Sequence, residues 1–288
     1  MTVTQLRQVF VPALFVLILA APLAAQVPPD LTADRTDFTR WLLSSPDSPL
    51  AAKARQPIDT AVSLGPASAD IPLAGLMAVH TLRRSASGAI TLESDAGSRA
   101  VPRGRLVPVG NYRLRVSGTA ERPVVTVFRD IDRAARPPAF FPYDPALVIT
   151  RPLDPPASGG RAPLLASDGS EVIAAEAGTV TLTVGGRTAT LRVRRIPVTG
   201  TDEAELELYF RDATNGRETY PAGRFVTLTP VGNGQVRIDF NRARNPFCAY
   251  NGVYPCPLPW PGNTLPAPVR AGEKYVGGGL SEPAVPTP

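Results

Sequence analysis

The stretch TVTLTVGGRTATLRV, residues 179–193, predicts a β-hairpin. Two runs rich in β-branched residues flank Gly185-Gly186, and glycine accepts the positive φ angles that a two-residue hairpin turn requires. Because side chains alternate along a strand, one face of the hairpin is apolar. That face consists of Val180, Leu182, Val184, Leu191 and Val193. A hairpin with one apolar face indicates an antiparallel sheet that packs on a core.

Similar alternation, interrupted by Gly, Ser and Pro, continues on both sides of this hairpin. Asn233-Gly234 predicts a second hairpin turn. The other strands that we expect are Ala89–Glu93, Tyr112–Ser117, Val124–Phe128, Glu205–Arg211, Gly223–Pro230 and Val236–Phe240. Leu31–Ser44 has the spacing of a short amphipathic helix, with Thr32 as its cap. The fold class expected is therefore mainly β, with a minor α component: antiparallel sheets, hairpins and one short N-terminal helix.

The first 25 residues have the layout of a secretory signal peptide. Arg7 gives a weakly basic start, Val9–Ala21 is apolar, and the small residues Ala24 and Ala25 precede the expected cleavage site. The apolar stretch is shorter than the 18 residues that a membrane span needs. We therefore expect an exported chain, periplasmic or secreted, without a membrane span after cleavage.

Composition shifts suggest a domain plan for the remainder. We expect a helix plus β region over residues 26–150, a C-terminal β lobe over 151–276 and a disordered tail over 277–288. Leu153–Pro163 is rich in Pro, Gly and Ser, and is either an exposed loop or a joint between subdomains.

The charge pattern and the single histidine exclude several classes of protein. The chain has 30 basic and 25 acidic residues, and nearly all the positive charge is scattered arginine. Nucleic-acid binding calls for a basic run or stripe, so the scatter argues against it while allowing a preference for anionic ligands or surfaces. His80 is the only histidine and lies in an apolar stretch, so a zinc site with several histidines is excluded and we expect a strand or core residue. No metal and no cofactor is predicted.

Residues 209–274 contain both cysteines and most of the unusual polar chemistry. Two cysteines eight positions apart in an exported protein predict a Cys248–Cys256 disulfide that pins the C-terminal loop. Asp212–Glu218 is interpreted as a turn, because Asp212 and Thr214 can hydrogen-bond to backbone amides and Gly216 allows a positive φ. A calcium loop is the less favoured reading, because the spacing does not fit its pattern.

The same region resembles the domain of unknown function 1684 family. The resemblance rests on the segments DATNGRETYPAGR, DFNRARNPFCA, CPLP with a following Asn, and AGEK, which lie between Asp212 and Lys274. It is strongest over Tyr209–Lys274, and it implies no activity. This chain departs from the family pattern at Arg244, Phe247 and Gly262.

The polar residues of this region support more than one hypothesis. Asp239 and Asn241 are two apart on an expected strand and so share a face, where they either bind a ligand with Arg224 or brace the sheet through a buried aspartate–arginine pair. The leading hypothesis is a site for a small polar or anionic ligand. Its candidate residues are Arg211, Asp212, Arg224, Asp239, Asn241, Arg242 and Asn245.

Two other functions stay open. One is a cofactor-independent hydrolase that uses carboxylates such as Asp239, Glu218 or Glu273. The other is a purely structural envelope protein. The aromatic residues near the cysteines, Tyr220, Tyr250, Tyr254 and Trp260, either recognise a carbohydrate or peptide or pack the loop onto the sheet.

Overall fold

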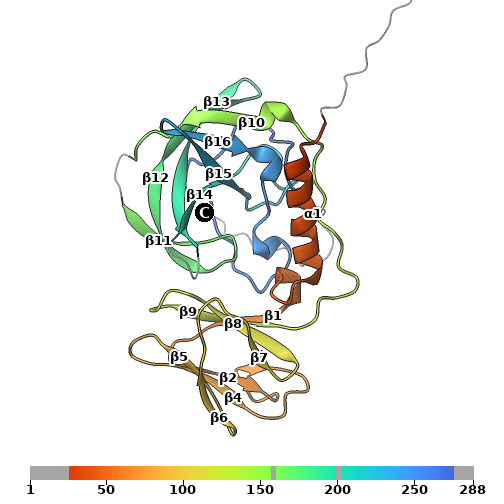
Figure 1. The fold of residues 1–288 in the computed structure, drawn as a ribbon, viewed down its shortest axis with the longest axis vertical. Helices are drawn as coiled ribbons and strands as arrows, with labels where there is room; N and C mark the ends of the chain where they lie inside the picture. Colours follow the sequence, from red (N-terminus) through yellow and green to blue (C-terminus); the bar gives the residue numbers. More distant parts are fainter. Residues whose placement is uncertain (1–25, 157–159, 199–202, 276–288) are drawn as a thin grey trace, which may run out of the picture.

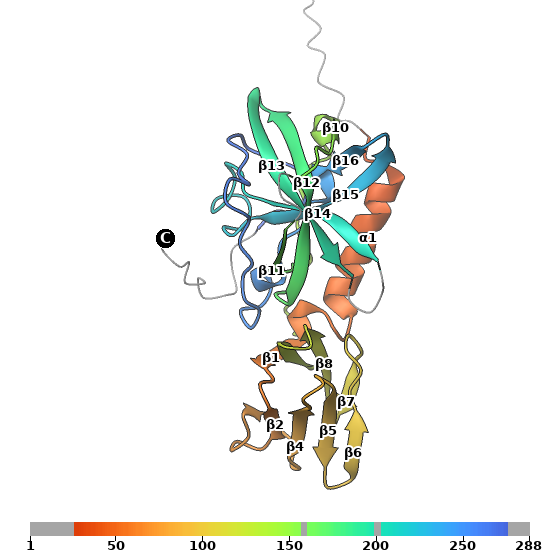
Figure 2. The ribbon, with the colours of Figure 1, turned by 90° about the vertical axis from the view of Figure 1, so that its left-hand side faces the viewer.

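The computed structural model describes residues 26–156, 160–198 and 203–275. The predicted signal peptide and the predicted C-terminal tail lie outside the described residues. Two β lobes lie end to end, with the smaller N-terminal lobe below the larger C-terminal lobe in Figure 1. The view turned by 90° in Figure 2 shows the same elongated arrangement. The chain is mainly β with antiparallel sheets, as the sequence predicts.

The N-terminal lobe packs two sheets around an apolar core. Their strand orders are β1-β9-β8-β7 and β3-β2-β4-β5-β6, and all neighbours are antiparallel except β2 and β3. The strands are β1 (Ala52–Pro57), β2 (Ala61–Gly65), β3 (Ile71–Pro72), β4 (His80–Arg84), β5 (Ile90–Ser94), β6 (Gly97–Ala100), β7 (Val107–Val109), β8 (Tyr112–Gly118) and β9 (Pro123–Phe128). Three of them, β5, β8 and β9, are the strands that alternation predicts. The others are short or polar, so periodicity does not reveal them.

The C-terminal lobe is built on a seven-stranded antiparallel sheet with the order β10-β16-β15-β14-β13-β12-β11. Its strands are β10 (Val148–Pro152), β11 (Arg161–Leu165), β12 (Glu171–Val184), β13 (Arg187–Pro197), β14 (Ala204–Phe210), β15 (Arg224–Gly232) and β16 (Gln235–Asp239). The sheet curls until Asp154, just after β10, forms a bridge with Thr179 of β12. The concave side holds the core, which alternate residues of the C-terminal segment also fill: Leu265, Ala267, Val269 and Ala271.

Both predicted hairpin turns are present. Gly185 and Gly186 have φ angles of 53° and 73° between β12 and β13, and Asn233 and Gly234 have φ angles of 50° and 67° between β15 and β16. The apolar face predicted for the first hairpin lies in the core of the lobe. These turns form where predicted because left-handed backbone is a local property of glycine and asparagine.

The helix α1 (Pro29–Ser44) lies along one side of the C-terminal lobe (Figure 1). It begins earlier than predicted, and Thr32 is not its cap: the hydroxyl of Thr32 donates instead to the carbonyl oxygen of Pro28. Pro29 suits the first helical position because its missing N–H would have no partner there. Leu31 and Leu42 are buried. No helix in the described part of the chain is long and apolar enough to cross a bilayer.

The Leu153–Pro163 segment does not separate the two lobes. It connects β10 and β11, which belong to the same sheet. The change from one apolar core to the other falls earlier, between Val127 and Leu147. Proline and glycine mark a loop locally, but only the strand pairing tells whether a loop lies within a sheet or between lobes.

A third apolar cluster joins the lobes, and the cysteine loop is at its centre. Phe128 of the N-terminal lobe packs in this cluster with Tyr220, Cys248 and Tyr254 of the C-terminal lobe. Asn251 in the loop donates to the carbonyl oxygen of Pro49, between α1 and β1, at 3.0 Å and to that of Ala52, the first residue of β1, at 2.8 Å.

Candidate functional site

Arg224 and Asp212 form an ion pair in the interior of the C-terminal lobe. Arg224 Nη2 lies 3.0 Å from Asp212 Oδ2, and neither side chain has exposed surface. The remaining Nη–H groups donate to the carbonyl oxygens of Val269, Ala271 and Glu273. Burial lowers the pKa of the guanidinium, against the opposing effect of Asp212. The Arg224–Asp239 pairing that the sequence suggested does not form.

Asp212 also organises the turn that follows it. Its Oδ1 accepts hydrogen bonds from the amide (2.8 Å) and hydroxyl (2.6 Å) of Thr214 and from the amide of Val269 (3.2 Å). Gly216 has a φ of 78°, which a turn residue with a side chain rarely adopts. The segment is therefore a structural turn, as interpreted from its spacing, and it ties β15 to the C-terminal segment.

Asp239 and Asn241 lie together, but only Asp239 belongs to a strand. β16 ends at Asp239, whose Oδ1 accepts from the backbone N–H of Asn241 at 3.1 Å and so caps the short 3-10 helix η3 (Phe240–Arg242). The strand reading of Asn241 is thus wrong, because the capping carboxylate turns the chain. Asp239 Oδ2 lies 3.3 Å from both Arg237 and Arg242. Asp239 is buried, but both arginines are partly exposed, so these pairs differ from the buried Arg224–Asp239 pair that the sequence suggested.

Helix α1 is held against η3 and the residues after it by ion pairs. Arg242 lies 2.5 Å from Asp30 Oδ2, and Arg244 Nη2 lies 2.6 Å from Asp34 Oδ2. The guanidinium of Arg244 also stacks on Phe38 of the helix, with Cζ 3.7 Å from the ring centroid. Arg244 departs from the pattern of the family that the sequence resembles, and in this chain it holds α1 against the C-terminal lobe.

Glu273 and Asn245 form a buried polar centre close to Arg244. One oxygen of Glu273 accepts from the backbone N–H of Asn245 at 2.9 Å, and the other accepts from the hydroxyl of Tyr250. Burial raises the pKa of Glu273 to about 7, although both hydrogen bonds favour the ionised form. Burial and the nearby Glu273 raise the pKa of Tyr250 well above its usual value.

Gly272 allows the chain to pass close to η3 at this centre. It has a φ of 73°, and a Cβ there would lie 2.6 Å from the carbonyl oxygen of Ala243. The A-G-E-K segment is therefore explained by packing: glycine for the close approach, and Glu273 for the buried hydrogen bonds.

A groove of about 600 Å³, open to solvent on one side, runs between α1 and the segment that ends at Phe140. Its walls are Val27, Thr32, Arg35, Thr36, Thr39, Arg40, Leu43, Pro138 and Phe140, with no carboxylate among them. Each of the three threonine hydroxyls donates to the carbonyl oxygen four residues earlier. Toward the groove, these hydroxyls can therefore act only as hydrogen-bond acceptors.

Arg35 gives this groove its charge. Its Cζ lies 4.7 Å from the centroid of the Phe140 ring, and its Nη2 donates to the carbonyl oxygen of Asn241 at 3.3 Å. Arg35 makes no ion pair within the described residues, and its buried Nε has no hydrogen-bond acceptor there. Burial, followed by repulsion from Arg244, lowers the pKa of this guanidinium.

Arg244 approaches the same aromatic ring. Its Cζ lies 5.7 Å from the Phe140 centroid, and its buried Nη1 also lacks an acceptor in the described part of the chain. Two arginine N–H donors near one ring thus have unused hydrogen-bonding capacity. Sequence reasoning missed Arg35 because it lies about 200 residues from Asn241, and only the helix packing brings the two together.

The predicted site residues are consequently divided among several places. Asp212 and Arg224 belong to the interior, Asp239, Asn241 and Arg242 lie beneath α1, and Asn245 lies beside Glu273. Arg211 is exposed and donates to the carbonyl oxygen of Pro221 at 3.1 Å. Of the acids considered for hydrolysis, Glu218 pairs with Arg270 at the surface, whereas Asp239 and Glu273 are buried. His80 lies on β4, as a strand residue.

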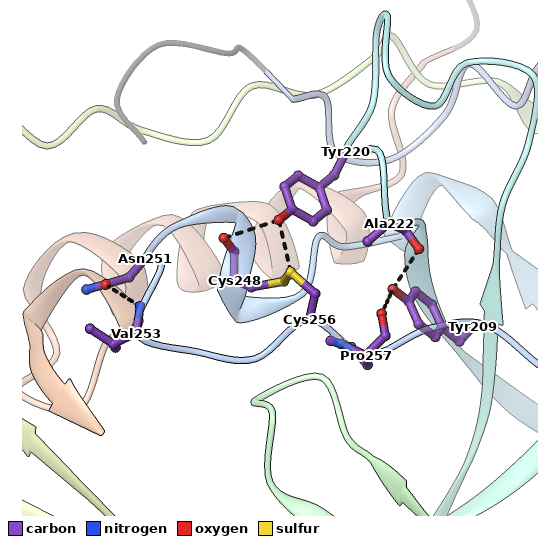
Figure 3. Close-up of a disulfide and its surroundings, with 8 residues drawn as sticks. All are labelled: Tyr209, Tyr220, Ala222, Cys248, Asn251, Val253, Cys256 and Pro257. Carbon is purple, nitrogen blue, oxygen red and sulfur yellow. Dashed lines mark hydrogen bonds between the residues drawn. A yellow bond between two sulfur atoms is a disulfide. The ribbon is translucent and has the colours of Figure 1, made fainter. Parts of the chain in front are cut away.

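The Cys248–Cys256 disulfide is present, with Cα atoms 5.5 Å apart (Figure 3). The Tyr220 hydroxyl lies 3.2 Å from Cys256 Sγ, and the Tyr209 hydroxyl lies 2.7 Å from the carbonyl oxygen of Pro257 (Figure 3). Tyr220 and Tyr254 are buried. These aromatic side chains pack the loop onto the lobe, which was one of the two interpretations of the aromatic cluster.

Two arginines of β13, Arg192 and Arg194, are paired with carboxylates. Arg192 Nη2 lies 2.8 Å from Glu176 Oε2, and Arg194 pairs with Glu207 across β13 and β14. The positive charges of these two arginines are therefore compensated locally. In the described ranges, no three His, Cys, Asp or Glu side chains are placed to hold a metal ion.

In comparison with known proteins, the C-terminal lobe matches the model of one family. Residues 137–274 match the family model described as "Protein of unknown function (DUF1684)". The solution NMR structure of an uncharacterized protein of Haloarcula marismortui is similar to 48% of this chain and 76% of that chain, with 29% identity and a TM-score of 0.41. No curated protein matches the chain. The C-terminal lobe therefore matches, over residues 137–274, the model of the DUF1684 family of proteins of unknown function, the family that the sequence resembles.

Proposed function

We propose that this chain is an exported protein that binds a small anionic ligand in the groove beside α1. The observation that carries the proposal is the pair of arginines near Phe140. Arg35 lines the groove without a carboxylate partner in the described residues, and Arg35 and Arg244 each have a buried N–H without an acceptor. An unsatisfied buried donor costs about 1–3 kcal/mol, and an anionic oxygen that reaches it recovers this free energy.

The remaining groove residues narrow the class of ligand. The hydroxyls of Thr32, Thr36 and Thr39 already donate within the helix, so toward a ligand they offer acceptors. Val27 and Leu43 add apolar surface. A small hydroxy acid or amino acid, which combines an anionic group with its own donors, suits this lining better than a bare inorganic ion.

Thermal shift and isothermal titration calorimetry with inorganic phosphate and a panel of small hydroxy and amino acids test the proposal. We expect at least one acid to raise Tm more than sodium chloride of equal ionic strength, and Arg35→Ala to weaken its binding about tenfold or more, since a hydrogen bond to a charged group contributes about 1.5–3 kcal/mol. Arg40→Ala is the matched control, because Arg40 lines the same groove but pairs with Asp37. The same affinity in Arg35→Ala as in wild type would overturn the proposal.

Export is supported by two features of the chain. The first 25 residues have signal-peptide layout, and the Cys248–Cys256 disulfide suits an oxidising compartment. Intact-mass measurement on protein from the envelope or medium should give a chain that begins near Gln26. A full-length cytoplasmic chain with two reactive thiols would contradict export.

The hydrolase alternative has no comparable support, because none of the described residues that line the groove is acidic. The structural alternative would be favoured if no acid in the panel bound.

A further inference from the structure

We infer that the N-terminal lobe docks on the surface of an anionic lipid bilayer through residues 73–79, which we name the apolar loop. Its sequence LAGLMAV has no charged or hydrogen-bonding side chain. Met77 is 86% exposed and Val79 is 47% exposed, whereas Leu73 and Leu76 are buried. The loop is thus anchored to the core of the lobe and presents a methionine to solvent.

Exposed arginines are connected to this loop through Tyr112 and the β7–β8 hairpin. The Tyr112 hydroxyl donates to the carbonyl oxygen of Ala74 at 2.9 Å and accepts from Arg129 Nη1 at 3.3 Å. Leu76 of the loop lies against Gly110, in the turn between β7 and β8. Arg113 pairs with Pro108 in the β7–β8 ladder, and Arg99 donates to the carbonyl oxygen of Pro108. Within the described residues, Arg99, Arg113 and Arg129 form no ion pair.

The distribution of charge favours an anionic surface. Residues 52–128 have ten basic and five acidic side chains, for a net charge of +5. The rest of the chain after Ala25 has 19 basic and 20 acidic residues, for a net charge of −1. The nearest acid along the chain, Asp70, is engaged by the amide and hydroxyl of Ser63.

The size of the exposed apolar surface favours a bilayer over a protein partner. A stable protein interface buries about 800 Å² on each side, far more than one methionine and its neighbours supply. Shallow insertion of a few apolar side chains, with arginines near anionic headgroups, gives weak and reversible membrane binding. This function concerns the lobe outside the α1 groove and does not depend on the proposed ligand.

Vesicle co-sedimentation tests the inference. The protein used begins at Gln26, which keeps every described residue and removes the apolar segment before it. We expect binding to vesicles of phosphatidylglycerol and phosphatidylcholine, little binding to phosphatidylcholine alone, and a loss of binding at high salt. Met77→Asp and the double variant Arg99→Glu/Arg113→Glu should each lower the partition coefficient about tenfold.

Leu258→Asp is the control, because Leu258 is 62% exposed on the C-terminal lobe. It should bind as wild type does, and circular dichroism should confirm that all variants fold. Equal partition of Met77→Asp and wild type would overturn the inference. Failure of wild type to bind either type of vesicle would also overturn the inference, and a protein partner would then be the favoured ligand of the apolar loop.

Discussion

The C-terminal lobe contains two arginine centres that differ in how completely their charges are matched. Arg224 has a carboxylate partner and three carbonyl acceptors, and only its Nε lacks a partner in the described residues. Arg35 has one carbonyl acceptor and no carboxylate partner in the same residues, and it borders an open groove. The Arg224 arrangement stabilises the fold, whereas the Arg35 arrangement leaves positive charge and a hydrogen-bond donor available to a ligand. Substitutions at the two centres should therefore separate stability from binding.

The largest loss of stability is expected at Arg224, the arginine whose charge is matched. Arg224→Ala leaves Asp212 buried and unpaired and removes the donors to the C-terminal segment, so we expect a loss of about 3–5 kcal/mol in the free energy of unfolding. Urea denaturation measures it. Arg211→Ala is the control, because Arg211 is nearby and exposed, and it should change stability by less than about 0.5 kcal/mol. If Arg224→Ala melted within a degree of wild type, Arg224 would not be needed for stability. The contrast between the Arg224 and Arg35 centres would then be wrong.

Glu273, which lies between the two centres, should make stability depend on pH. Its folded pKa of about 7 is higher than its ordinary value of 4.5. The protonated acid therefore stabilises the fold below about pH 4.5, and this contribution is lost as the pH rises through about 7. The loss should reach about 3 kcal/mol above pH 8.

Glu273→Gln should lack this component of the pH dependence, and parallel urea titrations from pH 4 to pH 8 measure the difference. Burial also raises the pKa of Glu207, so the difference from wild type is the informative quantity. Glu218→Gln at the surface is the control. Parallel curves for wild type and Glu273→Gln would show that Glu273 does not titrate in this range.

The cysteine loop brings Tyr250 to Glu273 and Asn251 to the connection between the lobes. Replacing both Cys248 and Cys256 by alanine should destabilise the protein by roughly 2.5 kcal/mol, because the short ring no longer restricts the unfolded chain. Thiol labelling of unreduced wild type should find no reactive thiol. Two labelled cysteines would refute the bond, and unchanged stability of the double variant would mean that the loop is held by packing alone.

The smallest stability change is expected at Asp34, on the unmatched side of the comparison. The Asp34–Arg244 pair is partly exposed, so Asp34→Asn should cost about 0.2–1 kcal/mol. The same change leaves Arg244 with more uncompensated charge, and the affinity for the acid identified by calorimetry should rise a few-fold. Glu93→Gln, which removes a partly exposed carboxylate paired with Arg83 in the N-terminal lobe, should leave that affinity unchanged. Weaker binding by Asp34→Asn would contradict this prediction and would mean that Asp34 is needed to hold α1, and with it the groove, in place.

Features that depend on a few neighbouring residues followed from the sequence. The turns at Gly185-Gly186 and Asn233-Gly234, the apolar face of the first hairpin and the disulfide between Cys248 and Cys256 are all as predicted. Their causes are local: the φ range of glycine and asparagine, the alternation of side chains along a strand, and the proximity of two cysteines in the chain.

Which distant residues pair with one another was decided only by the tertiary structure. The sequence indicated that Arg224, Asp212 and Asp239 are special, but strand register and the course of residues 264–273 decided that Arg224 meets Asp212. Arg35 entered the candidate site because α1 packs against η3, a contact between residues about 200 positions apart. Charges find partners according to three-dimensional distance and burial, and periodicity and turn chemistry contain no information about either.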